Sequence, residues 1–173
     1  MNIPKYRLIA AFFFAGAVAC SQPSARNASL CNSQEKVIFA CGFKNNKVAS
    51  ICGSPDAAQS YVEYRFGSKS AMELTYKSSQ VTPARLFHRA EVVYANNAED
   101  TIWFKNGRYT YSIFLPARGT PGLEVSRDGD VVAHLECKGG WSGVTGDPKM
   151  PSRFIEDHGS SDPSTLEQFG LSQ

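Results

Sequence analysis

Apolar and polar residues alternate along most of the chain between residues 35 and 137, with the two-residue period that is typical of half-buried β-strands. Gly, Asn, Asp and Pro separate the alternating segments at short intervals. About nine short strands of this kind predict a single all-β domain, an antiparallel β-sandwich or barrel built of hairpins. The expected strands are 35–43, 48–52, 61–66, 72–76, 86–94, 101–105, 108–115 and the two that flank Asp128-Gly129, the second ending at Cys137.

The first hairpin turns at Asn45-Asn46, because Asn tolerates the positive φ angles of tight turns. Its alternation is expected to place Cys41 and Cys52 on one face, directly opposite each other with a four-residue loop and diagonal with a two-residue loop. The next hairpin is expected to have a five-residue loop that sets Arg65 opposite Glu73.

Asn106-Gly107 is the strongest hairpin signal in the chain. A two-residue turn at this point pairs Phe104 with Tyr109 on the inner face. The residues expected to point outward are Trp103, Lys105 and Arg108. In the last hairpin, a two-residue turn would set Leu123 opposite His134, whereas a three-residue loop with Gly129 left-handed sets Leu123 opposite Ala133. We expect the second register because it keeps apolar residues together.

The N-terminal segment predicts export. Lys5 and Arg7 precede an apolar run that is too short to span a bilayer and ends in Ala-x-Ala, so residues 1–19 are expected to be a signal peptide. A-V-A-C also resembles a bacterial lipobox, with Ala17 where such boxes usually have Leu. Lipidation of Cys20 is expected because it leaves an even number of cysteines, 5 − 1 = 4, for disulfides; ordinary cleavage is the alternative.

The remaining domain boundaries follow from composition. Residues 20–30 are polar and form a tether, residues 31–137 form the β domain, and residues 138–173 are expected to be an irregular tail rich in Gly, Ser, Pro and Asp. Removing the two basic residues of the leader lowers the Lys and Arg count from 18 to 16, which equals the 16 acidic residues. A neutral chain offers no electrostatic footprint for nucleic acid, so no nucleic-acid partner is expected.

Distance excludes one disulfide pairing. The strand from Glu35 to Cys41 advances by ~20 Å, whereas the short link back to Cys31 reaches at most ~14 Å. Cys31–Cys41 is therefore excluded. Two connectivities remain: Cys41–Cys52 with Cys31–Cys137, or Cys31–Cys52 with Cys41–Cys137. We expect the first, whose long bridge is worth ~4.7 kcal/mol in the chain-entropy model.

Catalytic and metal motifs are missing from the sequence. His88, His134 and His158 show no ligand spacing, so neither a metal nor a cofactor is expected. His88 is expected to be a core histidine, on one inner face with Leu86, Ala90, Val92 and Tyr94, and His158 to be solvated. The segment 140–143, G-W-S-G, has Val rather than Gly next and is not a nucleophile elbow.

The outward cluster of Trp103, Lys105 and Arg108 is the expected partner-binding surface, because Trp and Arg are over-represented at binding hot spots. The alternative is that Trp103 packs against a second sheet or under the tail.

Across Cys31 to Gly67 the chain resembles an uncharacterised family of small bacterial secreted proteins and lipoproteins, on the motifs C-x(3)-E-K-V-I-F-A-C, K-V-A-S-I-C and Y-V-E-Y-R-F-G. The resemblance continues through E-L-T-Y and ends at Leu135-Glu136-Cys137. The resemblance implies a Gram-negative origin, but no activity or site residue. A small lipidated β-domain is also similar in general form to lysozyme inhibitors and toxin-immunity lipoproteins.

These features together predict a non-enzymatic protein of the periplasm, anchored to the outer membrane by lipid on Cys20, that binds another envelope protein and inhibits a lytic enzyme or toxin. The alternatives are a hydrolase with an unrecognised site and a structural scaffold of the envelope.

Overall fold

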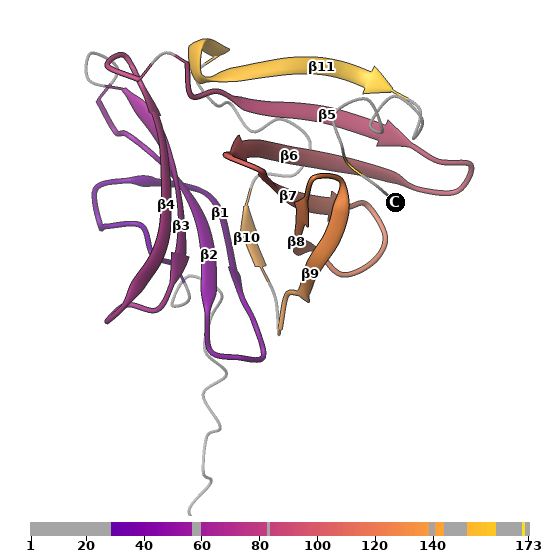
Figure 1. Ribbon diagram of the computed structural model, residues 1–173, viewed down its shortest axis with the longest axis horizontal. Helices are drawn as coiled ribbons and strands as arrows, with labels where there is room; N and C mark the ends of the chain where they lie inside the picture. The colour runs from indigo at the N-terminus through magenta and orange to yellow at the C-terminus, as the bar shows by residue number, and fades with distance from the viewer. Residues whose placement is uncertain are drawn as a thin grey trace, which may run out of the picture.

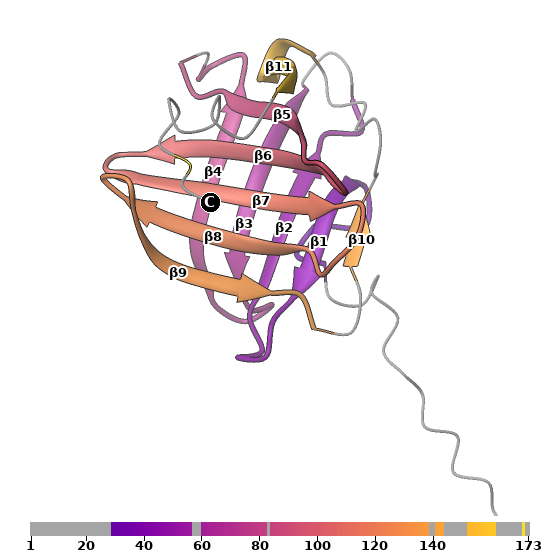
Figure 2. The same ribbon diagram turned by 90° about the vertical axis from the view of Figure 1, so that its right-hand side faces the viewer.

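The structure, a computed structural model, describes residues 29–56, 60–82, 84–138, 141–143, 152–161 and Leu171. Within these residues the chain forms two β-sheets that face each other, and the strands of one sheet run across those of the other (Figures 1 and 2). The predicted all-β fold is confirmed, and of the two predicted architectures the sandwich is the one observed. Among the described residues, no helix is long and apolar enough to span a membrane.

Each sheet is built mainly of sequential antiparallel hairpins. The first has five strands in the order β10-β1-β2-β3-β4, and the second has six in the order β11-β5-β6-β7-β8-β9. The strands of the first sheet are β1 (Lys36–Gly42), β2 (Val48–Gly53), β3 (Tyr61–Gly67), β4 (Met72–Ser79) and β10 (Trp141–Gly143). Those of the second are β5 (Phe87–Val93), β6 (Ala98–Asn106), β7 (Tyr109–Pro116), β8 (Gly122–Arg127), β9 (Asp130–Glu136) and β11 (Ile155–Ser161).

Three predicted hairpin registers are wrong by two residues over most of their length, so most side chains keep their predicted face. Met72 and Val131 do not, because each lies beyond a register shift near the turn. In β3–β4, Phe66 pairs with Leu74, and Arg65 lies opposite Thr75 rather than Glu73. In β6–β7 the turn is at Gly107-Arg108, and Phe104 pairs with Tyr111. Glycine with positive φ at the first turn position suits the type II′ turn, which the Asn106-Gly107 signal did not distinguish from type I′.

In β8–β9 the turn has two residues, with positive φ at both Asp128 and Gly129. A register shift beside Val125 then brings Leu123 opposite Leu135 rather than Ala133. Apolar residues are paired as expected, but an extra residue inside β9, not a longer turn, achieves this.

The register of the β1–β2 hairpin differs from the predicted register by an odd number of residues. Gly42 pairs with Val48 and Cys41 with Ala49, and Asn46 adopts a φ of 60° in the loop. Because Cys52 lies three residues beyond Ala49, it points to the opposite face of the sheet from Cys41.

The preferred disulfide connectivity is therefore wrong, and the alternative is present. Cys41, on the inner face, is joined to Cys137, and Cys52, on the outer face, is joined to Cys31. Cys31–Cys41 is absent, in agreement with the distance argument. The bridge to Cys137 spans a sequence separation of 96 residues and ties the end of β9 to β1 across the two sheets.

The main hydrophobic core lies between the sheets and is largely aromatic. Phe104 stacks on Tyr76 and Tyr111, with ring centroids 4.3 Å and 5.0 Å apart, and is in contact with Phe87 and Tyr64. Only Phe87 of β5 faces this core. The predicted inner face of β5 instead contributes Ala90 and Val92 to a second, smaller cluster on the outer side of the six-stranded sheet, with Trp103 and Leu171.

The prediction of an irregular tail after Cys137 is wrong for the described part of that segment. β10 pairs with β1, so that Trp141 lies opposite Cys41 and the G-W-S-G segment contributes an edge strand. A short 3-10 turn at Ser152–Phe154 then leads into β11, which pairs in parallel with β5. One edge of each sheet is thus formed by residues whose local sequence has no strand pattern.

Candidate functional site

Trp103 is buried, which contradicts its predicted role as an exposed anchor. Only 1 % of its surface is accessible. Trp103 does point away from the core between the sheets, in the direction that the alternation of apolar and polar residues predicted. On that outer side the rings of His88 and His158 stack on it at centroid distances of 5.4 Å and 5.3 Å, and Leu171 packs in the same cluster. The alternative that Trp103 lies under the tail is the one observed.

The other two members of the predicted surface are exposed but serve different neighbours. Arg108 pairs with Asp128 in the adjacent hairpin turn, through Nε to Oδ1 at 3.0 Å and through a second contact from its Nη2. Its side chain is 66 % exposed, so this ion pair contributes little to stability. Lys105 lies close enough to His88 for its positive charge to lower the pKa of that histidine. Trp103, Lys105 and Arg108 therefore do not form one exposed hot spot.

A cluster of two histidines and a glutamate lies where Trp103 was expected to meet a partner. The parallel pairing of β11 with β5 sets Glu156 beside His88, and His158 follows on the same face of β11. Nδ1 of His88 lies 3.3 Å from Nε2 of His158 and 3.3 Å from Oε2 of Glu156. The three potential ligand atoms all lie within 4.8 Å of one another. His158, expected to be solvated, is half-buried.

The protonation of His88 is set by its surroundings. Partial burial lowers the pKa of His88, and the charges of His158 and Lys105 lower it further, while Glu156 opposes them. The imidazole is therefore neutral at pH 7, which leaves one ring nitrogen free to accept a hydrogen bond or a metal ion.

A second candidate site lies at the free edge of β9. Among the described residues β9 pairs only with β8, and Figure 2 shows it along the lower edge of the six-stranded sheet. Val131 and Val132, in its first half, are 48 % and 56 % exposed. An exposed apolar edge strand has unpaired backbone groups that can add a strand from another chain.

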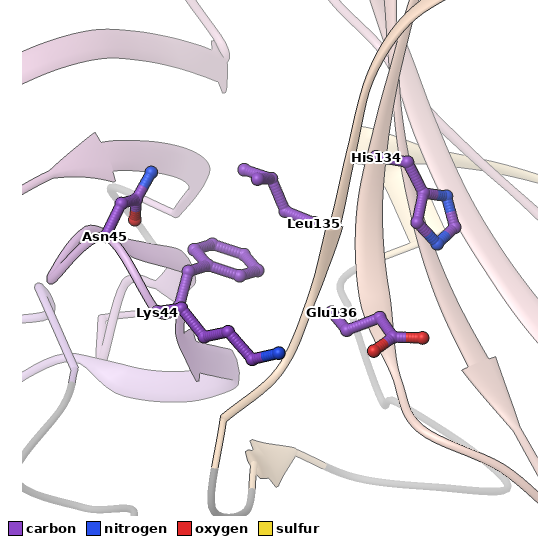
Figure 3. A pocket seen from close by; sticks show the side chains of 6 residues that line it. Lys44, Asn45, His134, Leu135 and Glu136 are labelled. Carbon is purple, nitrogen blue, oxygen red and sulfur yellow. The ribbon is translucent and has the colours of Figure 1, made fainter.

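A pocket of about 300 Å³ adjoins this edge. Its lining residues are Phe43, Lys44, Asn45, His134, Leu135 and Glu136. Leu135 and His134 project from opposite sides of β9, and Lys44 and Asn45 lie on the side of Leu135 (Figure 3). The pocket is thus a corner between the β1–β2 turn and the end of β9.

Covalent and backbone links hold this corner in place. The Cys41–Cys137 disulfide joins β1 to the residue after β9, and the amide of Lys138 donates to the carbonyl of Gly42 at 2.7 Å. The position of the pocket therefore depends on the long-range disulfide.

A second polar cluster, centred on Arg65, lies on the outer face of the five-stranded sheet and links its residues by hydrogen bonds. Arg65 donates to both carboxylate oxygens of Glu35 at 2.7 Å and to Glu63 at 2.8 Å. Burial raises the pKa of Glu35, but hydrogen bonds from Arg65, Tyr61 and the Asn32 amide outweigh burial and leave the pKa below its usual range. The nearby sulfurs of Cys31 and Cys52 are joined to each other and are not metal ligands.

The histidine cluster was not predicted from the sequence, because His88 and His158 are 70 residues apart in the chain. The only local signal is Glu156-x-His158, which would have placed two ligands on one face if 155–161 had been recognised as a strand. Cys20 lies outside the described residues. Comparison with family models, with curated proteins and with solved structures finds no match for this chain.

Proposed function

We propose that this protein is a non-enzymatic protein of the cell envelope that binds another protein by adding an extended segment of the partner to the free edge of β9. The observation that carries the proposal is the exposed pair Val131 and Val132 on an edge strand that leads into the pocket at Leu135. In this recognition mode the backbone of the edge strand supplies affinity, and a side-chain pocket supplies specificity.

The opposite free edge of the sandwich is less suited to strand addition. β4 has exposed charges at Glu73 and Lys77 along its length, whereas the exposed charges of β9, Asp130 and Glu136, lie at its two ends. Charged side chains on an edge strand discourage pairing with other chains. β9 instead has two adjacent exposed valines, and Lys44 and Glu136 at the pocket offer one charge of each sign to a peptide. We therefore propose that the partner binds at β9. We propose further that this protein acts on its partner as an inhibitor or immunity protein.

The proposed location is the periplasm, with a lipid anchor at Cys20. Two disulfides in a small domain support an oxidising compartment. Intact-mass analysis of the membrane fraction should show an acylated N-terminus at Cys20. A fully soluble protein that begins at Cys20 without lipid would contradict the anchor but not the binding site.

The binding site is tested by site-specific photo-crosslinking in cells. A photoreactive residue at position 132 should yield a discrete adduct with one envelope protein, whereas the same residue at position 81 should not. Val81 is a matched control because it is an apolar residue, 88 % exposed, that follows β4 of the other sheet. Equal adducts at both positions, or none at position 132, would contradict the proposal.

The identified partner then allows a quantitative test. Val132→Asp places a charge on the edge strand and should weaken binding at least tenfold, ~1.4 kcal/mol, with an unchanged melting temperature. Val81→Asp should bind as the unchanged protein does. A normal affinity for Val132→Asp would show that the partner does not use β9.

A hydrolase is the second candidate function, because His88, Glu156 and His158 bring three polar side chains together. It requires turnover of an ester, peptide or glycan substrate by the purified protein and loss of turnover in His158→Ala. Turnover that persists in this variant, or no turnover at all, would rule the cluster out as an active site.

A further inference from the structure

We infer that His88, Glu156 and His158 bind a divalent transition-metal ion of the zinc class. This site is distinct from β9, and it departs from the expectation that the protein has no metal. Two imidazoles and one carboxylate are ligand types that Zn²⁺ takes in proteins, and three protein ligands leave the fourth tetrahedral position for water.

The distances between the ligand atoms support this assignment. Metal–ligand bonds of ~2.05 Å at tetrahedral angles require ligand atoms ~3.3–3.4 Å apart. Nδ1 of His88 lies 3.3 Å from both Nε2 of His158 and Oε2 of Glu156. The remaining pair is within 4.8 Å, so a modest side-chain rotation of Glu156 closes the third edge.

Two paired strands carry all three side chains, and His158 lies where the register of β11 on β5 shifts after Asp157. Glu156 and His158 are two residues apart on β11, and His88 is the cross-strand partner of Glu156 on β5. The regular cross-strand pair of His88 and Glu156 fixes the spacing of two ligands, and the distance from His88 to His158 places the third beside them.

The surroundings of the cluster favour metal binding on one side and leave access on the other. The buried Trp103 ring forms an apolar floor beneath both imidazoles and holds their planes within 22° of its own. The side chain of Glu156 is 54 % exposed, so an ion can enter from solvent. The charge of Lys105 opposes a cation here, whereas Glu156 favours it.

The test is calorimetric titration of the full, disulfide-intact chain with Zn²⁺ at pH 7.5. One ion per chain should bind, and affinity should fall as the pH is lowered through the histidine range, because protons compete for the imidazoles. The chain has two tryptophans, so in a Trp141→Phe background the fluorescence of Trp103 reports on the cluster alone. Cu²⁺, which binds the same ligands, should quench that fluorescence.

Three variants distinguish Zn²⁺ bound at the cluster from Zn²⁺ bound elsewhere, because every variant keeps the other zinc ligands, such as Cys20. His158→Ala and Glu156→Gln should each weaken Zn²⁺ binding at least tenfold. Glu156→Gln leaves the stacked rings in place, so it remains informative if His158→Ala destabilises the fold. His134→Ala is the matched control, because His134 also lies beside a glutamate, with Nδ1 3.4 Å from Oε2 of Glu124, and the described residues offer no third ligand there.

Full affinity in His134→Ala together with weakened binding in the two cluster variants would support the inference. The inference would be overturned if the unchanged protein showed no saturable Zn²⁺ binding, or if all three variants bound Zn²⁺ with equal affinity.

Discussion

Replacing Trp103 with alanine should destabilise the protein by ~3–5 kcal/mol, the cost of removing a buried aromatic side chain. The reason is that this outward-facing residue is covered, with 1 % of its surface exposed under the rings of His88 and His158 and beside Leu171. Alternation along the strand predicted only that this side chain points outward, to a partner or under the tail; an outward side chain that is exposed would cost little to remove.

The magnitude follows from the area that the indole buries. An aromatic side chain removes ~150–250 Å² from water, and at ~25 cal/mol per Å² this amounts to ~4–6 kcal/mol. Alanine retains a small part of that area, while the cavity above Ala90 and Val92 adds to the cost. For a protein with a urea m value of ~2 kcal/mol per M, the midpoint of unfolding should fall by ~1.5–2.5 M.

The assay is urea denaturation of the oxidised protein, followed by far-ultraviolet circular dichroism so that the signal does not depend on the mutated tryptophan. Tyr109→Ala is the control on the neighbouring strand, because Tyr109 is 38 % exposed and should cost far less. A midpoint shift for Trp103→Ala that is no larger than the shift for Tyr109→Ala would refute the burial of Trp103.

Two further predictions concern the first sheet and its disulfide. The hydrogen bonds of Arg65 and its neighbours hold the pKa of Glu35 below its ordinary value of 4.5, so the ionised carboxylate contributes stability that is present above pH 4.5 and lost as the pH falls through the folded-state pKa. The melting temperature of Glu35→Gln should therefore depend less on pH between 3 and 6 than that of the unchanged protein. Parallel curves of melting temperature against pH for the two proteins would contradict this. Peptide mapping without reduction should find Cys41 joined to Cys137. Replacing both cysteines with serine should lower the free energy of unfolding by ~4.7 kcal/mol in the chain-entropy model. A peptide that joins Cys41 to Cys52 would show that the β1–β2 register is wrong.

The sequence by itself determined the strands and the faces of most of their residues. Alternation is a local property, because the pleat turns successive side chains to opposite sides whatever the partner strand is. Trp103 was therefore correctly directed away from Phe104 and the core. Register errors of two residues in three hairpins left this assignment intact.

The sequence could not determine the disulfide connectivity, since this depends on one loop. Asn46 with positive φ gives the first hairpin an odd register, which turns Cys52 to the face opposite Cys41. A single residue more or less in that loop would have put both cysteines on one face. The local signal predicts a turn but not its length.

The tertiary structure alone decided what the outer face of the six-stranded sheet contains. β11 has no apolar alternation and forms because its backbone pairs in parallel with the free edge of β5. This pairing joins residues that are 70 positions apart, such as His88 and His158, and covers Trp103. Residue spacing along the chain does not encode such a meeting, because it depends on which sheet edge remains open after the hairpins have paired.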